Sequence, residues 1–516
     1  MHWRADPHAR TGPAALVAAG LIALNLGALG AVAWRAEAGA GLSAADWAAA
    51  RFTVTQAVLS ALLSVALAIP VARALFRRRF PGRQALIVLM GAPFVLPVLV
   101  AVLGLIAVFG RNGVLNAALE ALGLPAVSIY GFHGVVIAHV FFNLPLSVRL
   151  ILQGWARIPA EHLRLSEALG LGPFARFRHV EGPMLARVVP GALAVVFLMC
   201  LTSFAVALTL GGGPRATTLE LAIYQAFRFD FDLGRAALLA LVQAGIGVLA
   251  LLALARMTLP ETALRGLERA VPAPRGGLAR AIDAACITMA ALFLLLPLSM
   301  VVLRGAPHVA GLPLAVWAAL GQSLLVAGAS VVLLAAMTAA LTLGALTRRW
   351  PEGVGSVALA SSPMVIGTGL FIILHPLGDP ARWAWGVTAL VNAAMAVPFA
   401  LRAVLPAARA AQADYARLSQ ALGLSWQGHL RFALWPRVRR PAGFALGLGA
   451  ALSLGDLGVI VLFAQTGGET LPMQVQRLMG AYRSDDAAGA ALVLLVVALA
   501  GFALFERWVG GRDADT

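Results

Sequence analysis

Long apolar runs constrain the fold of this chain more than any other feature. An α-helix needs about 20 apolar residues to cross the ~30 Å of hydrocarbon in a bilayer. About a dozen runs of that kind, with charged residues only at their ends, occur at 13–34, 52–75, 84–110, 131–151, 188–210, 235–257, 282–303, 319–346, 354–375, 383–405, 441–463 and 487–508. We therefore predict an all-α polytopic membrane protein with about 12 transmembrane helices.

Charged residues are scarce, and every basic residue is an arginine. Only 12% of the residues are charged, about half the share in a soluble chain, and the 39 basic residues are all Arg. A P-loop needs the Lys of its G-x-x-x-x-G-K-[ST] motif to reach the phosphates of ATP. This chain cannot form such a site, so if ATP drives it, another chain hydrolyses that ATP.

The Arg residues that give the net charge of +16 are distributed as expected for a membrane protein. With the N-terminus inside and the spans alternating, roughly three quarters of the Arg residues fall on the cytoplasmic side, as the positive-inside rule requires. Nucleic-acid binding needs a contiguous basic patch on a soluble fold, whereas these residues lie between apolar runs. We expect both termini in the cytoplasm and no nucleic-acid partner.

The first apolar run has two interpretations. Pro13 to Trp34 precedes Ala36-Glu37-Ala38, which is similar to the small-residue site where signal peptides are cleaved. The run is longer than the about 7–15 apolar residues of a signal peptide. We predict a retained membrane helix, with a cleaved signal peptide as the alternative.

A repeat divides the chain into two halves. Arg164–Leu171 (RLSEALGL) and Arg417–Leu424 (RLSQALGL) agree at seven of eight positions and lie 253 residues apart. The same offset pairs Pro145 with Pro398. Six predicted spans separate the two copies, so both face the same side of the membrane. We predict two parallel repeats of six helices each.

The repeat also sets the predicted domain boundaries. The first half covers 1–258, with a membrane core at about 52–257 and the repeated loop at 157–187. A cytoplasmic linker rich in Pro and Gly covers 259–281. The second half covers 282–516, with a core at about 319–508 and the loop at 409–440.

The repeated loop predicts a helix, a glycine break and a second helix in each half. Pro159 and Asp414 are candidate helix starts, and Gly170 and Gly423 are candidate stops. Small and apolar residues share one face of each first helix, namely Leu165, Ala168 and Leu169, and Leu418, Ala421 and Leu422. An exposed helix with an apolar face offers it to a partner. The alternative is a solvated basic connector on the membrane surface.

The loop resembles the EAA loop of type I ABC importer permeases. The resemblance rests on Leu169, Gly170, Phe177, Val180 and Pro183, and on Leu422, Gly423, Leu430 and Pro436, with 13 residues from glycine to proline in both copies. Both copies depart from the family pattern at its first three positions, where Arg-Leu-Ser replaces Glu-Ala-Ala. The resemblance implies a type I permease core in each half. It also implies that the loop is a coupling helix seated in an ATP-binding subunit, present in two copies.

Other segments resemble the fused thiamine permeases of the same family. These segments are 203–214, 217–225, 453–459 and 480–486. The resemblance implies import of thiamine and its phosphates across a bacterial inner (plasma) membrane, by alternating access and from a periplasmic substrate-binding protein. It implies no catalytic residue, metal or cofactor in this chain. Ferric iron or an inorganic oxyanion is the alternative substrate.

A 12-helix secondary transporter is the alternative class, because two parallel halves also describe the major facilitators. That class carries its characteristic loop between its second and third helices. Here Arg77–Arg83 resembles that loop only through its charge. The repeated motif of this chain lies between the fourth and fifth helices of each half, as in ABC permeases.

Asp456 is the one carboxylate well inside a predicted span. Charged groups in the membrane are costly enough to be candidates for a functional site. We predict that Asp456 lines the translocation path as a counter-charge to a cationic substrate, opposite its neutral repeat-mate Ser203. The alternative is that it bonds to a neighbouring helix or caps a break at Gly455 and Gly458.

Two short amphipathic stretches lie on the periplasmic side, one in each half. Their apolar stripes are Leu219, Ala222, Ile223 and Ala226, and Leu471, Val475, Leu478 and Tyr482. Such a helix could be a gate or docking ledge, or an interfacial helix lying among the headgroups.

Overall fold

The structure of the chain is a computed structural model, and every regular element in its described part is helical. It describes residues 7–36, 41–91, 93, 95–213, 216–255, 277–355, 362–464 and 468–511. The predicted linker at 259–281 lies, up to residue 276, outside the described residues.

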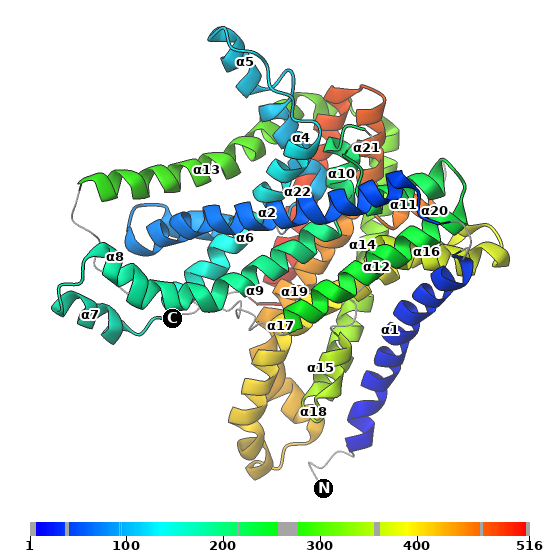
Figure 1. Cartoon of the computed structure of the whole chain (residues 1–516). Helices are drawn as coiled ribbons and strands as arrows, with labels where there is room; N and C mark the ends of the chain where they lie inside the picture. The colour runs from blue at the N-terminus through cyan, green and yellow to red at the C-terminus, as the bar shows by residue number, and fades with distance from the viewer. Residues whose placement is uncertain are drawn as a thin grey trace.

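The helices fall into two similar series (Figure 1). The first series is α1 (Pro7–Arg35), α2 (Ala44–Arg77), α3 (Arg83–Leu89), α4 (Val98–Phe109), α5 (Val114–Ala121), α6 (Phe132–Ala156), α7 (Ala160–Ala168), α8 (Pro173–Arg176), α9 (Gly182–Leu201), α10 (Phe204–Leu210), α11 (Leu219–Arg228) and α12 (Leu233–Ala255). The second is α13 (Gly277–Gly305), α14 (Leu314–Ala345), α15 (Trp350–Gly355), α16 (Pro363–Leu374), α17 (Ala384–Ala421), α18 (Trp426–His429), α19 (Trp435–Leu454), α20 (Ile460–Phe463), α21 (Leu471–Gly480) and α22 (Ser484–Trp508).

Most of the predicted spans are continuous helices. Within the described residues, ten helical segments are long and apolar enough to cross a membrane. Of the other two predicted runs, 354–375 contains the shorter apolar helix α16, and 441–463 covers the second part of the 20-residue helix α19 and all of α20. The predicted all-α polytopic fold is therefore confirmed.

The third span of each half is interrupted by proline. Pro97 precedes α4 and Pro363 opens α16. Proline lacks the N–H that a continuing helix would use and disfavours a helical residue before it. In each of these spans a shorter helix therefore begins partway along the predicted apolar run.

The first helix of each half packs against the other half. Helix α1 lies against α14 and α16, and α13 lies against α2 and α4. The contacts are close because glycines face them: a Cβ on Gly369 of α16 would overlap the backbone of Ala28, and one on Gly104 of α4 would lie 2.5 Å from the carbonyl oxygen of Pro297. The first apolar run is thus a helix packed against the second half, and its retention stays a prediction.

We expect Gly369→Ala to destabilise this cross-packing. The new methyl group would have to displace the backbone of α1, and overpacking of this kind costs about 1–3 kcal/mol. The measurement is the thermal midpoint of the detergent-purified protein. The matched control is Gly328→Ala in α14, where a Cβ meets nothing within 4 Å; equal midpoints for the two variants would contradict the prediction.

Candidate coupling loops and translocation path

Both repeated loops contain a helix that ends at the predicted glycine. Gly170 and Gly423 have φ values of +61° and +63°, in the left-handed region that favours glycine. The N–H of Leu171 donates to the Ser166 carbonyl oxygen and that of Leu424 to the Ser419 carbonyl oxygen, each at 3.0 Å. These are Schellman-type stops, so both predicted stops are confirmed.

The two helices before these glycines begin differently. Helix α7 starts directly after Pro159, as predicted. Asp414 does not start a helix, because α17 continues without a break from Ala384 to Ala421. The repeat offset places Gln412 where the first copy has Pro159. Without a proline the backbone can stay helical, and the prediction of a separate helix at Asp414 was wrong.

The predicted apolar faces are on the surface. Leu165 and Leu169 are 57% and 64% exposed, and Leu418 and Leu422 are 52% and 65% exposed. Ala168 and Ala421 are exposed beside them. Figure 1 shows α7 with α8 and the end of α17 with α18 at the tips of two separate arms.

The second part of each loop also repeats closely. A π-helical turn begins at Phe177 in the first half and at Leu430 in the second, 253 residues later. Pro183 and Pro436 follow at the starts of α9 and α19. Both prolines and Phe177 are exposed, and Leu430 is partly buried. The site residues predicted from the loop motif thus occupy equivalent places in the two halves.

Ion pairs hold the first loop to the membrane helices. Glu181, whose side chain is only 3% exposed, lies 2.7 Å from Nε of Arg73 and 3.0 Å from Nη2 of Arg77, both on α2. Nε of Arg176 on α8 lies 3.8 Å away. One buried carboxylate therefore joins the loop to α2.

Hydrogen bonds of a buried histidine hold the second loop together. Nδ1 of the buried His429 lies 2.8 Å from Oγ of Ser419, and its Nε2 lies 3.0 Å from Oε1 of Gln412. Leu434 stands where the first copy has Glu181. The same loop shape is thus fixed by charge in one half and by a histidine in the other.

The fifth helix of each half is broken inside the membrane region. Helix α9 ends at Leu201 before α10 begins, and α19 ends at Leu454 before α20 begins. In the first break, Nε2 of Gln56 donates to the Cys200 carbonyl oxygen at 2.9 Å and Nε2 of Gln243 donates to the Leu201 carbonyl oxygen at 3.1 Å. Lipid cannot satisfy freed backbone groups, so these side chains do.

Asp456 lies in the second break and Ser203 in the first. Oδ1 of Asp456 accepts a hydrogen bond from the Gly458 N–H at 3.1 Å, which is the capping role of the alternative prediction. Its Oδ2 is buried and has no hydrogen-bond partner among the described residues. Nearby, Nδ2 of Asn392 donates to Oγ of Ser453 at 3.1 Å. One oxygen of the carboxylate thus shapes the backbone of the break.

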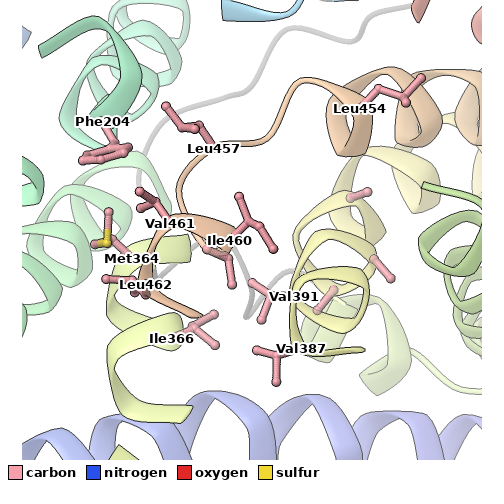
Figure 2. Close-up of a cluster of buried hydrophobic side chains, with 14 of the residues drawn as sticks. Phe204, Met364, Ile366, Val387, Val391, Leu454, Leu457, Ile460, Val461 and Leu462 are labelled. Carbon is pink, nitrogen blue, oxygen red and sulfur yellow. The ribbon is translucent and has the colours of Figure 1, made fainter. Parts of the chain in front are cut away.

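An apolar cluster surrounds the second break. Figure 2 shows the chain leaving α19 after Leu454 and turning into α20, with Ile460 and Leu462 directed toward α16 and α17. Phe204 of the first half lies on the other side of the cluster. We call this cluster the apolar seal; its labelled members are Phe204, Met364, Ile366, Val387, Val391, Leu454, Leu457, Ile460, Val461 and Leu462.

The short amphipathic helices are part of the protein core. The predicted stripe of α11 is buried, and so are Leu471, Val475 and Leu478 of α21. Their first N–H groups are received by equivalent side chains: Leu219 donates to Oγ1 of Thr53 and Leu471 to Oγ of Ser323, each at 2.8 Å. An interfacial helix among headgroups is therefore excluded for both.

Tyr482 was wrongly placed on the second stripe. Helix α21 ends at Gly480, and Tyr482 has a φ of +58° and is 93% exposed. The chain turns away from the helix axis there, so the helical period no longer applies.

Glu220 is a buried carboxylate that the sequence patterns missed. It is 1% exposed near the start of α11, and its Oε1 lies 3.4 Å from Nε2 of Gln243. Glu220 falls between the predicted spans, where a carboxylate is expected to meet water, so its position in the sequence does not indicate burial. The buried stripe of α11 is the signal that could have found it, since Glu220 directly follows the first residue of that stripe.

We expect Glu181→Ala to loosen the first loop alone. The change leaves three Arg side chains without their shared carboxylate, and the free energy of local opening should fall by about 2 kcal/mol. The measurement is hydrogen exchange of residues 160–181, with residues 409–434 as an internal reference. Glu161→Ala, which removes an exposed carboxylate of α7, is the control. Equal exchange in both variants would show that the ion pairs do not hold the loop.

Comparison with known proteins identifies the family. Residues 64–259 match the model of the binding-protein-dependent transport system inner membrane component. The chain is 41% identical to the thiamine transport system permease protein ThiP of Brucella abortus, over 98% of this chain and 97% of the relative. It is 40% identical to that of Escherichia coli, over 91% and 90%.

The similarity persists in a more distant relative, the permease of the same name from Haemophilus influenzae. That protein is 34% identical over 90% of this chain and 88% of its own length. The type I permease core predicted from the loop motif agrees with these matches. The chain therefore belongs to the family of thiamine transport system permeases, multi-pass inner-membrane proteins of binding-protein-dependent transport.

Proposed function

We propose that this chain is the membrane subunit of an ATP-driven importer for thiamine and its phosphates. A separate ATP-binding subunit, present in two copies, would supply the energy, and a periplasmic substrate-binding protein would deliver the substrate. The absence of Lys supports the first part, because a P-loop needs one. The names of relatives that cover nearly the whole chain support the choice of thiamine over ferric iron or an oxyanion.

The observation that carries this proposal is the pair of equivalent, exposed apolar helix ends. Each arm presents two leucines that are more than half exposed, followed by a left-handed glycine. A monomeric soluble surface rarely gathers apolar side chains in this way without a partner. The proposed ATPase-coupling residues are Leu165, Ala168, Leu169, Gly170, Phe177 and Pro183, and Leu418, Ala421, Leu422, Gly423, Leu430 and Pro436.

The two loops would pass movement to the membrane helices by different routes. In the second half the route is direct, because α17 runs through the loop helix without a break. In the first half the chain leaves the helix at Pro159, and Glu181 reconnects the loop to α2 through Arg73 and Arg77. Closure of two ATP-binding subunits would then draw the two arms together and alternate access to the path.

The proposed organisation keeps the predicted halves. The halves are 1–258 and 282–516, joined by a linker at 259–281, and both termini lie in the cytoplasm. Three Arg at 77–79 and the cluster at 437–440 support this orientation through the positive-inside rule.

The proposed translocation path passes the breaks that hold Ser203 and Asp456. Thiamine carries a positive charge on its thiazolium ring, and the buried Oδ2 of Asp456 is the carboxylate oxygen that could face it. The apolar seal around Leu457 and Ile460 would keep the path closed to ions until the halves move.

Replacing an exposed leucine by aspartate should prevent binding of the ATP-binding subunit. Leu169→Asp and Leu422→Asp each place a charge on a contact that buries apolar area, and each should weaken binding by about 1.5–3 kcal/mol. The measurement is co-purification of the ATP-binding subunit with the tagged permease. Leu122→Asp changes a leucine that is 74% exposed at the end of α5 and should have no effect. Retention of the subunit by both loop variants would disprove the coupling surface.

Asp456→Asn should lower thiamine uptake without preventing assembly. The amide oxygen can still accept the hydrogen bond from Gly458, so the break persists, while the negative charge is lost. We expect uptake of radiolabelled thiamine to fall about tenfold. Asp485→Asn, at a side chain that is 82% exposed, is the control. Normal uptake by Asp456→Asn would remove the residue from the path.

A further inference from the structure

A polar cavity lies where the two halves meet, next to the apolar seal. Its volume is about 290 Å³, near the lower end of the range for ligand pockets, ~300–1,000 Å³. The first half contributes Tyr224 and Arg228 of α11, and the second half contributes Glu469 and Arg477 of the α21 region. The space fits one small organic molecule in contact with both halves.

The inner wall of the cavity is apolar. Leu208 of α10 and Leu457 of the second break form part of it. Leu457 is also a member of the apolar seal (Figure 2) and directly follows Asp456. A molecule in the cavity would therefore lie next to the apolar seal and beside the break that contains Asp456.

The polar lining carries an excess of positive charge. Nη1 of Arg477 lies 2.8 Å from Oε1 of Glu469, so these two charges offset each other. Arg228 is exposed, and within the part of the chain that the structure describes it has no ion pair or hydrogen bond. A guanidinium group binds phosphate oxygens through paired N–H donors. The cavity thus offers one unpaired guanidinium and one partly paired guanidinium to an anion.

The ring of Tyr224 in the cavity lining is held in place by two aromatic neighbours. Tyr224 packs edge-to-face against Phe204 and Phe229, with ring centroids 5.4 and 5.7 Å apart. These neighbours restrict the ring, so stacking on it costs little side-chain entropy. Aromatic faces attract cations and flat heteroaromatic rings.

We propose that this cavity binds the phosphate esters of thiamine, with the phosphate held by Arg228 and Arg477 and the rings lying against Tyr224 and the apolar wall. This inference rests on the proposed function and sharpens it. It makes Arg228 a residue that determines specificity for phosphorylated over free thiamine. Because the two arginines belong to different halves, the phosphate also bridges the surfaces that part when the seal opens.

The test compares two substrates in the complete transporter. Permease, ATP-binding subunit and binding protein are reconstituted in proteoliposomes, and uptake of radiolabelled thiamine pyrophosphate and of thiamine is measured at subsaturating concentration. Arg228→Gln should lower uptake of thiamine pyrophosphate about tenfold, the effect of losing one charged hydrogen-bonding group, and leave thiamine uptake unchanged. Arg483→Gln is the matched control, because Arg483 is an exposed arginine of the same face that pairs with Asp486 and does not line the cavity.

Each outcome has one meaning. A selective loss of pyrophosphate uptake supports the site. An equal loss for both substrates overturns it, since a role in gating or in docking of the binding protein would not distinguish them, and no loss for either substrate also overturns it. If the unchanged transporter takes up thiamine but not its pyrophosphate, the inference fails and the proposed function stands. If it takes up neither, both fail.

Discussion

The part of this structure with the most consequences is the interruption of a helix in each half inside the membrane. Hydrocarbon cannot hydrogen-bond the backbone groups that an interruption frees, so protein side chains must do so. After Leu201 the donors are Gln56 and Gln243, which reach in from neighbouring helices. After Leu454 the chain uses its own Asp456 to receive the N–H of Gly458. The same structural need is met by neutral amides in one half and by a carboxylate in the other.

This difference places a carboxylate in only one of the two equivalent breaks. A carboxylate that only shaped the backbone could be replaced by a neutral residue, as the first half shows with Ser203 at the equivalent position. The buried Oδ2 of Asp456 adds a cost that the fold alone does not need. The proposed cationic substrate, where it passes the break, would offset that cost.

The sequence predicted those features that depend on local pattern. The apolar runs, the two copies of the loop motif and the stops at Gly170 and Gly423 each follow from residues close together in the chain, and the structure contains them. Asp414 failed as a helix start because a candidate cap is weak within the alanine-rich stretch 407–421, which contains no proline. The start at Pro159 succeeded because proline acts directly on the backbone.

Features that depend on contact between the halves could not be predicted. The burial of Glu220 could not be predicted because only the packing of α11 shows it. The cavity between Arg228 and Arg477 joins residues about 250 positions apart in the chain, and neither loop alone carries a motif. Hydropathy locates charges within apolar runs but gives no information on charges that folding buries elsewhere.

The cross-packing of the first helices limits how the proposed transport cycle can proceed. Because α1 lies on the second half and α13 on the first, at glycines that allow backbone contact, the halves cannot separate without breaking both contacts. We therefore propose that the movement is a rocking of one half against the other, which keeps these contacts. Helix α17 would connect the two ends of this movement, since Val391 lies in the apolar seal and Leu418, 27 residues later, lies at the loop. The two residues are roughly 40 Å apart along one continuous helix. The first half lacks such a continuous helix, because the chain turns at Pro159. Its connection depends instead on the ion pairs of Glu181, so the two arms share a shape and a proposed partner but differ in how they are joined to the membrane helices.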